Sequence, residues 1–240
     1  MIQTPELIVA LDFPNQREAL DLASRLRGVV NWVKVGLELF LVGGQPLVEE
    51  LKEAGFQVFL DLKFMDIPNT VQAAVSRATA MGADMLTIHT LGGRAMAEAA
   101  LVGREAAMTA GQAAPRVLGV TILTSMGPAD LVWNPHGSDE DLQAQTVELA
   151  MAAQNWGLDG VVCSGREVRA IRRRCEASFN LLTPGIRLPG ANAGDQTRVC
   201  TPAQAVRDGS TFLVVGRPIT RASDPVDAAR TYHAEIAQPF

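Results

Sequence analysis

The sequence predicts a (β/α)₈ barrel that takes the whole chain, residues 1–240, as a single domain. Short, almost continuously apolar runs alternate with amphipathic helical patterns along nearly the full length. The runs number eight, and a helical pattern follows each of them, as in α/β barrels. The 240 residues also fit, since such barrels commonly occupy about 200–250 residues as one unit. No low-complexity linker divides the chain.

The eight apolar runs are typical of parallel strands buried on both faces, which are apolar at nearly every position. They cover residues 6–12, 29–35, 57–63, 83–89, 116–123, 159–164, 179–185 and 211–216.

The segments between the runs carry start and stop signals of helices. Asn15, with Glu18 three residues later, resembles an N-terminal cap, and Gly28 marks a C-terminal stop. In the same way Ser138 opens a helical pattern that Gly157 closes. The other expected helices cover residues 39–54, 68–81, 94–110, 166–174, 202–208 and 225–236.

An open, doubly wound sheet is the alternative fold. It usually has fewer strands and carries a Gly-rich G-x-G-x-x-G turn after an early strand. Here the first strand leads instead into Asp12-Phe13-Pro14, so the barrel is favoured.

Composition and charge narrow the classes of function. An apolar fraction of 48% with a net charge of −5 excludes a disordered chain, and a pI near 5.3 argues against nucleic-acid binding. Cys163, Cys175 and Cys200 form no C-x-x-C pattern, which predicts neither a disulfide framework nor a zinc site. The apolar runs are too short for a membrane span, and no basic residue precedes Arg17 as in a signal peptide. We therefore expect a cytoplasmic protein without a bound metal.

Charged and polar residues interrupt the apolar pattern where the predicted strands end, which is where barrels of this type carry their active sites. Those after the first, second, third, fifth, seventh and eighth strands are Asp12, Lys34, Asp61, Lys63, Asp66, Thr124, Ser125, Arg187 and Arg217. Asp61 and Lys63 lie two apart and therefore project to the same side of a strand. A structural ion-pair network at the barrel mouth is the alternative interpretation.

A lysine held between carboxylates stays protonated, because opposite charges favour its charged form. Such a lysine is a proton donor rather than a nucleophile, and it stabilises negative charge that develops nearby. Fixed carboxylates would in turn destabilise an anionic group on a substrate. This arrangement suits a decarboxylation, or a related enolate reaction, that leaves a carbanion to be protonated.

The last two strands lead into residues that suit a phosphate group. Gly185 and Arg187 follow the seventh strand, and Gly216 and Arg217 follow the eighth, at the position of the phosphate site of many barrels. Exposed backbone N–H groups and guanidinium groups both bind phosphate oxygens. We interpret residues 187–196, which are small and polar, as a lid that closes on the phosphate.

The segment Asp61-Leu-Lys63-Phe-Met-Asp66-Ile-Pro-Asn-Thr70 resembles the signature of the orotidine 5′-phosphate decarboxylase family. So do the opening ALDF, the KVG of the second strand, the LTS after the fifth, TPGIR after the seventh and VVGRPIT of the eighth. The resemblance covers nearly the whole chain in order. It implies a (β/α)₈ barrel that decarboxylates orotidine 5′-phosphate to UMP, the last step of de novo pyrimidine biosynthesis, without a cofactor.

The resemblance also implies roles for the catalytic residues. Lys63 would deliver the proton to C6 of the pyrimidine, and Asp61 would crowd the substrate carboxylate. Asp66 would complete an alternating Asp-Lys-Asp-Lys array with Lys34. In this family Asp66 and Thr70 reach into the site of the neighbouring subunit, which implies a homodimer with shared sites.

The remaining residues implied by the resemblance bind the substrate. Asp12 and Lys34 would hold the ribose together with Thr70 of the partner subunit. Thr124 and Ser125 would bind the pyrimidine edge. The phosphate would be held by Arg187, Gln196, Gly216 and Arg217. Two further contacts with the substrate are expected from Ile67 and Pro184.

Two other functions compete with this interpretation. A metal-dependent sugar-phosphate decarboxylase or aldolase-type synthase on the same barrel would share D-x-K-x-x-D, but not the I-P-N-T extension. The other is a non-catalytic barrel that binds a phosphate ligand, in which the array of charged residues has only a structural role.

Overall fold

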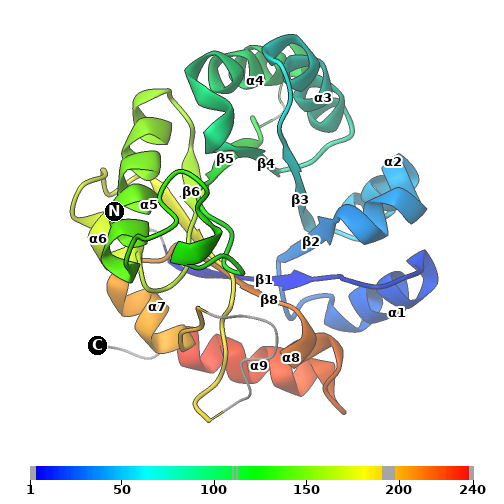
Figure 1. Ribbon diagram of the computed structural model, residues 1–240. Helices are drawn as coiled ribbons and strands as arrows, with labels where there is room; N and C mark the ends of the chain where they lie inside the picture. The colour runs from blue at the N-terminus through cyan, green and yellow to red at the C-terminus, as the bar shows by residue number, and fades with distance from the viewer. Residues whose placement is uncertain (1–3, 110, 112, 191–197, 238–240) are drawn as a thin grey trace.

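The computed structural model describes residues 4–109, 111, 113–190 and 198–237. Eight parallel strands close into a barrel in the order β1-β2-β3-β4-β5-β6-β7-β8, which confirms the predicted fold. Figure 1 looks into the ring of strands, with the helices packed around its outside. The strands are β1 Glu6–Ala10, β2 Trp32–Gly36, β3 Gln57–Phe64, β4 Met85–His89, β5 Arg116–Val120, β6 Gly160–Val162, β7 Asn180–Thr183 and β8 Phe212–Val215.

The helices follow the strands in alternation, with short 3₁₀ turns at Thr90–Gly92 and Pro128–Asp130. They are α1 Gln16–Leu26, α2 Leu37–Glu53, α3 Pro68–Ala80, α4 Gly93–Ala107, α5 Asp139–Asn155, α6 Val168–Arg172, α7 Pro202–Asp208, α8 Arg217–Thr220 and α9 Pro225–Ile236. None of the helices described is both long and apolar enough to cross a membrane.

The capping signals place several helix ends correctly. The side chain of Asn15 accepts a hydrogen bond from the backbone N–H of Glu18, and Ser138 caps α5 in the same way, with Asp141 completing the capping box. Within α2 the backbone kinks at Gly44, which takes a φ of 54°, because Pro46 has no N–H to continue the helical ladder.

Several expected element ends are off by one to three residues, and two differences bear on the site. The strand expected to run to Leu123, with Thr124 and Ser125 at its end, stops at Val120. Its ladder ends there because the carbonyls of Ile122 and Leu123 accept hydrogen bonds from the Arg198 side chain instead of a neighbouring strand. The other correction is an additional short helix, α8, which starts at Arg217 directly after the last strand.

Alternate residues along each strand face the inside of the barrel, as the two-residue period of a strand requires. The interior is filled by one apolar cluster: Ile8, Ala10, Trp32, Phe59, Met85, Leu118, Leu182, Phe212 and Val214. A second, larger cluster lies between the barrel and its helices and contains the outward-facing residues, such as Leu7 and Val9.

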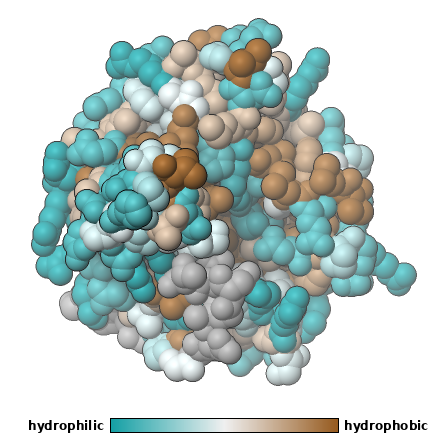
Figure 2. Space-filling view, in the orientation of Figure 1, coloured by the Kyte–Doolittle hydropathy of each residue, from teal (hydrophilic) through white to brown (hydrophobic). Residues whose placement is uncertain are grey.

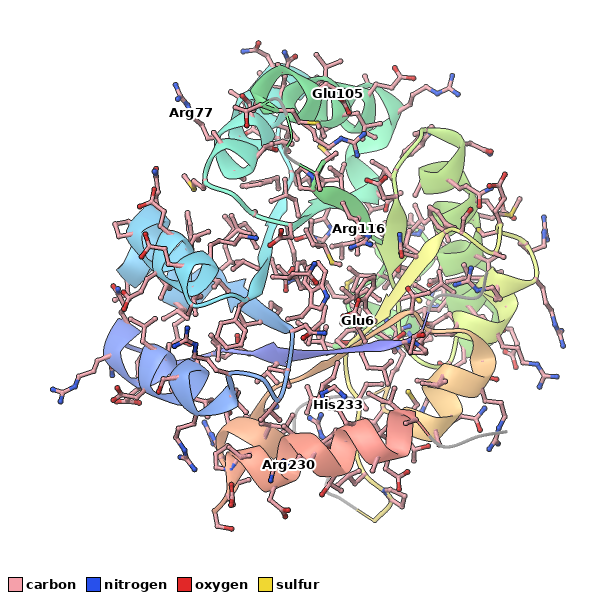
Figure 3. The ribbon with its side chains drawn as sticks, turned by 180° about the vertical axis from the view of Figure 1, so that it is seen from behind. Glu6, Arg77, Glu105, Arg116, Arg230 and His233 are labelled. Carbon is pink, nitrogen blue, oxygen red and sulfur yellow. The ribbon has the colours of Figure 1, made fainter. Side chains whose placement is uncertain are left out.

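The end of the barrel where the strands begin is closed by packing. The edge of the Trp32 ring meets Phe212 with ring centroids 5.5 Å apart. The Arg116 guanidinium lies 5.9 Å from the centroid of Trp32 and 5.4 Å from that of Phe212. Seen from this end, Arg116 and Glu6 lie near the middle of the ring (Figure 3). These side chains therefore fill the middle of the barrel at this end.

Candidate active site

The charged residues of the first three strands continue the inward-facing series of the barrel core. Ile8 and Ala10 lead to Asp12, Trp32 leads to Lys34, and Phe59 leads to Asp61 and Lys63. The same alternation that buries the apolar residues therefore turns these side chains into the barrel at the carboxyl ends of the strands.

Asp61 lies at the centre of this group. Its Oδ2 is 2.8 Å from Nζ of Lys63 and 3.7 Å from Nζ of Lys34, and its Oδ1 accepts a hydrogen bond of 2.9 Å from the Thr87 hydroxyl. Nζ of Lys34 is also 2.9 Å from Oδ1 of Asp12. Burial raises the pKa of Asp61, but the two ammonium groups and the hydrogen bonds from Lys63 and Thr87 outweigh it and lower the pKa overall. The carboxylate is therefore ionised at neutral pH.

The backbone at Lys63 takes a conformation that is unusual for a residue with a side chain. Its φ is 51°, and no other non-glycine residue described has a positive φ. The register between β3 and β4 shifts between Leu60 and Phe64, and the N–H of Lys63 leaves the ladder to donate 3.0 Å to the Thr87 hydroxyl. Strained backbone of this kind is common at functional sites, where it directs one side chain.

Gly36 makes room for the pair formed by Lys34 and Asp12. A Cβ at this position would lie 2.9 Å from Nζ of Lys34 and 3.3 Å from Oδ1 of Asp12. A side chain here would push the ammonium group away from its present position, so glycine after Lys34-Val35 leaves room for the contact between Lys34 and Asp12.

The charged residues of the first three strands line a cavity of about 400 Å³ at the carboxyl ends of the strands. Figure 2 shows a hollow in the same face of the molecule, with hydrophilic residues inside it. Nine of the residues expected at the site line the cavity: Asp12, Lys34, Asp61, Lys63, Thr124, Pro184, Arg187, Gly216 and Arg217. Apolar side chains of the barrel core, Phe59, Leu182 and Val214 among them, complete its wall.

Arginine side chains line the cavity after each of the last two strands. Arg187 follows β7, and Arg217 is the first residue of α8. Burial lowers the pKa of Arg187, and the positive charge of Arg217 lowers it further, partly offset by Tyr232. Two guanidinium groups that face one cavity favour an anionic group between them.

Other expected residues do not line this cavity. Asp66, Ile67 and Thr70 are exposed at the start of α3, where the Asp66 carboxylate accepts 2.6 Å from the N–H of Ile67. Ser125 lies beyond Thr124, outside the cavity wall. Gln196 lies outside the described residues, as does most of the segment expected to form a lid.

Sequence reasoning missed several residues that line the cavity. Glu38 comes from the first turn of α2 and Arg221 from the end of α8. Cys163, from the end of β6, is also in the wall, and burial raises the pKa of its thiol well above the usual value. Glu38 carried a usable signal, because it follows closely after Lys34-Val35-Gly36; Cys163 carried none beyond its position in an apolar run.

Among the described residues, no three His, Cys, Asp or Glu side chains come together in an arrangement that could hold a metal ion. The chemistry that the described site offers comes from two ammonium groups, three carboxylates and three guanidinium groups around one cavity. An ammonium group can donate a proton, and the guanidinium groups can bind an anion some distance from it.

Comparison with known proteins gives one consistent group of relatives. Residues 5–232 match the model of the "Orotidine 5′-phosphate decarboxylase / HUMPS" family. The orotidine 5′-phosphate decarboxylase of Maridesulfovibrio salexigens is 53% identical over 231 residues, which cover 96% of this chain and 98% of that protein. The one from Nitratidesulfovibrio vulgaris strain DP4 is 54% identical over 235 residues, 97% of each chain.

Solved structures agree with these sequences. The crystal structure of orotidine 5′-phosphate decarboxylase from Lactobacillus acidophilus superposes with a TM-score of 0.85 at 36% identity, covering 98% of this chain and all of that one. The one from Pyrococcus horikoshii superposes with a TM-score of 0.77 at 25% identity, covering 97% of this chain and all of that one.

Proposed function

This chain belongs to the orotidine 5′-phosphate decarboxylase / HUMPS family, and from that premise we propose that it converts orotidine 5′-phosphate to UMP, the last step of de novo pyrimidine biosynthesis. The expected family and the expected enzyme class, a carboxy-lyase, are confirmed by relatives at about 50% identity over nearly the full chain. The observation that carries the mechanism is the contact of 2.8 Å between Lys63 Nζ and Asp61 Oδ2 inside the cavity.

In the proposed reaction Lys63 is the proton donor. The bond between C6 of the pyrimidine and its carboxylate carbon breaks, CO₂ leaves, and the electron pair stays on C6. The Lys63 ammonium group then gives its proton to C6 and is protonated again from solvent. Asp61 accepts a hydrogen bond from that ammonium group and holds it in place before the reaction.

Asp61 acts on the substrate as well as on Lys63. A second carboxylate placed beside it is repelled, and the loss of CO₂ removes that repulsion. Lys34 compensates the charge of Asp61 from the other side at 3.7 Å. Asp66 would supply the second carboxylate of the alternating array, from a partner subunit.

Phosphate binding contributes to catalysis at the far end of the substrate. We assign the phosphate to Arg187, Gly216, Arg217 and Gln196, and the pyrimidine edge to Thr124 and Ser125, with Pro184 beside it. Binding energy from a remote phosphate can hold the reacting atoms in place against Lys63, which lowers the barrier of the chemical step.

We also propose that two copies of the chain, each a single catalytic domain, assemble into a homodimer with shared sites. Asp66, Ile67 and Thr70 are all exposed and follow closely in sequence after Lys63 of the cavity. Exposed apolar side chains lie on the elements near this segment, and Figure 2 shows brown side chains over the region of α2 and β3. These exposed apolar residues, here called the α2–α4 face, are Leu37, Leu41, Val42, Met65, Ile67, Leu91 and Val102.

A second copy is the occupant that this face suits, because it would cover the apolar residues and bring Asp66 and Thr70 to the neighbouring cavity. Sedimentation velocity of the wild type and of Leu41→Asp tests the assembly. Leu41 is 83% exposed. Val132, in the loop after β5, is 84% exposed, so Val132→Asp is the matched control away from this face. We expect a dimer for the wild type and the control and a monomer for Leu41→Asp. A monomeric wild type would contradict the proposal.

The cytoplasm is the proposed compartment. Cys163, Cys175 and Cys200 are all free thiols, which suits reducing conditions.

The proposed reaction is tested by incubating orotidine 5′-phosphate with the purified protein in D₂O and excess EDTA. Ultraviolet absorbance follows the loss of substrate, and NMR identifies the product. We expect UMP with deuterium at C6 and a rate unaffected by the chelator. Turnover that stops with EDTA would favour metal-dependent chemistry, and a folded protein without turnover would favour a binding protein.

A further inference from the structure

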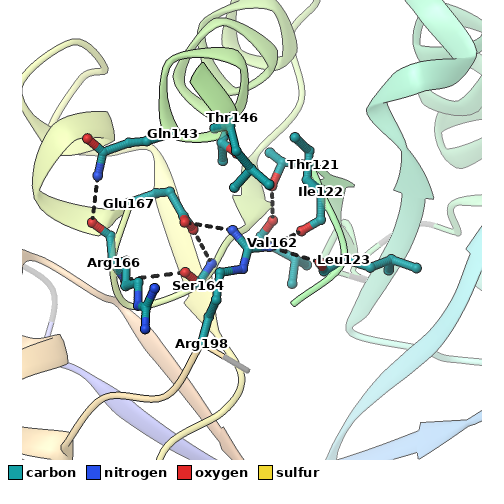
Figure 4. Close-up of polar contacts among 11 residues, drawn as sticks. Thr121, Ile122, Leu123, Gln143, Thr146, Val162, Ser164, Arg166, Glu167 and Arg198 are labelled. Carbon is teal, nitrogen blue, oxygen red and sulfur yellow. Dashed lines mark hydrogen bonds and ion pairs between the residues drawn. The ribbon is translucent and has the colours of Figure 1, made fainter. Parts of the chain in front are cut away.

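A buried ion pair lies behind the cavity wall without lining the cavity itself. Arg198 is 6% exposed and Glu167 2%, and Nη1 of Arg198 donates 2.7 Å to Oε1 of Glu167. Figure 4 shows the Arg198 guanidinium between Glu167 on one side and the backbone of Ile122 and Leu123 on the other.

The pair joins the segments that follow three neighbouring strands. Nη2 of Arg198 donates to the carbonyls of Ile122 (3.2 Å) and Leu123 (2.8 Å), in the segment after β5. Oε2 of Glu167 accepts 2.8 Å from the N–H of Ser164, in the segment after β6. Arg198 itself belongs to the segment between β7 and α7. These contacts hold the three segments to one another at the end of the barrel that carries the cavity.

Two of the joined segments carry different parts of the cavity. Ile122 and Leu123 line it directly, and Thr124 follows them on the side assigned to the pyrimidine. Arg187 lines the side assigned to the phosphate, and its N–H donates 2.9 Å to the carbonyl of Cys200, two residues after Arg198. One guanidinium group therefore connects, through short contacts, the walls around the two ends of the substrate.

Stability alone is a weak reason for such a pair, because well-packed apolar residues often stabilise a fold as well as a buried ion pair does. A guanidinium group adds what apolar residues lack, namely directed bonds to two carbonyls and a carboxylate at once. We propose that Arg198, oriented by Glu167, is a positioning residue that fixes the wall around Thr124 relative to the phosphate-binding Arg187. This inference rests on the proposed function.

Arg198→Lys and Glu167→Gln test the inference, because both nearly keep the size of the side chain and weaken only the bonds described. A lysine cannot reach the carboxylate and both carbonyls together, and a glutamine leaves the guanidinium without a charged partner. Arg104→Lys is the matched control: Nη1 of Arg104 donates 2.7 Å to Asp159, in an ion pair at the opposite end of β6 from the cavity. Melting temperatures of all variants show what each change costs in stability.

Steady-state kinetics with orotidine 5′-phosphate give the main readout. We expect kcat/KM to fall about 10- to 100-fold in Arg198→Lys and Glu167→Gln, chiefly through KM, and to stay within about twofold of wild type in Arg104→Lys. In the same two variants, Arg198→Lys and Glu167→Gln, the affinity for UMP, measured by calorimetry, should fall together with kcat/KM. Kinetics of both variants that match the control beside an active wild type would overturn the inference alone; an inactive wild type would overturn the proposed function and this inference together.

Double-mutant cycles separate positioning from a general loss of stability. Arg198→Lys is combined with Arg187→Ala and, separately, with Thr124→Ala. If Arg198 acts by placing these residues, each double variant should lose little more kcat/KM than its more damaging single change. Fold-losses that multiply in both cycles would overturn the proposal.

Discussion

Replacing Asp61 with asparagine removes one negative charge from between two ammonium groups while keeping the shape of the side chain. The carboxylate is 2.8 Å from Nζ of Lys63 and 3.7 Å from that of Lys34, and Thr87 donates to its other oxygen. An amide can still accept one of these hydrogen bonds. It leaves the two ammonium groups facing each other with Asp12 as the closest compensating charge described.

The expected cost in stability follows from the burial of the partners. Removing one member of a fully buried ion pair costs about 3–5 kcal/mol of unfolding free energy. The Lys63 side chain is 30% exposed, so water compensates part of the loss, and we expect about 2–3 kcal/mol for Asp61→Asn. For a chain of this size that is a fall in Tm of about 4–12 °C.

The pH dependence of the same change has a definite sign. The native structure lowers the pKa of Asp61, so its carboxylate stabilises the fold at pH values above the unfolded pKa, which is about 3.9. This stabilisation is lost as the pH falls through the lower, native pKa. The difference between wild type and Asp61→Asn should therefore be constant from about pH 5 to 7 and shrink below about pH 4.

Urea unfolding at pH 7 and pH 3, with calorimetry for Tm, measures both effects. Asp12→Asn is the comparison, because Asp12 also contacts Lys34 at 2.9 Å but its side chain is 53% exposed, which limits the expected cost to about 1 kcal/mol or less. If Asp61→Asn cost no more than Asp12→Asn at pH 7, or if its cost were unchanged at pH 3, the assignment of Asp61 as the buried charge centre would be refuted.

Three further outcomes are expected. Arg217→Ala should raise KM for orotidine 5′-phosphate about 10- to 100-fold with the fold intact, since a guanidinium–phosphate contact is lost; steady-state kinetics that leave KM unchanged would contradict this. Thr87→Val should raise the pKa of Asp61 and lower the free energy of unfolding by about 1–3 kcal/mol, because it leaves buried polar groups without partners; urea unfolding measures the loss. Mixing inactive Lys63→Ala and Asp66→Ala chains should restore about a quarter of wild-type activity through hybrid dimers with one intact site, and no recovery after subunit exchange would argue against shared sites.

Most of the fold could be predicted because the strands of a closed parallel barrel are apolar on both faces. Each apolar run of the sequence contains most or all of one strand of the structure. The strand ends could not be placed as well, since they depend on tertiary contacts: β5 stops at Val120 where the Arg198 side chain takes over the carbonyls of Ile122 and Leu123. Nothing in the residues around Ile122 indicates an arginine so distant in the sequence.

The centre of the site was predictable for a related reason. The two-residue period of a strand places Asp61 and Lys63 on one side, and buried charges that interrupt an inward-facing apolar series are costly to a fold unless they neutralise one another. Residues reached by loops were harder to place. Glu167 and Arg198 lie 31 positions apart and look like surface charges in the sequence, yet they form the most buried of the ion pairs described.

The central claim is that Lys63 protonates C6 of the substrate, and the turnover of Lys63→Ala tests it most directly. The rate of loss of orotidine 5′-phosphate absorbance is compared with wild type, on protein whose Tm and affinity for UMP are measured in parallel. We predict a folded variant that still binds UMP and turns over at least about 1,000-fold more slowly. A variant that keeps turnover within about tenfold of wild type would show that the proton comes from another group.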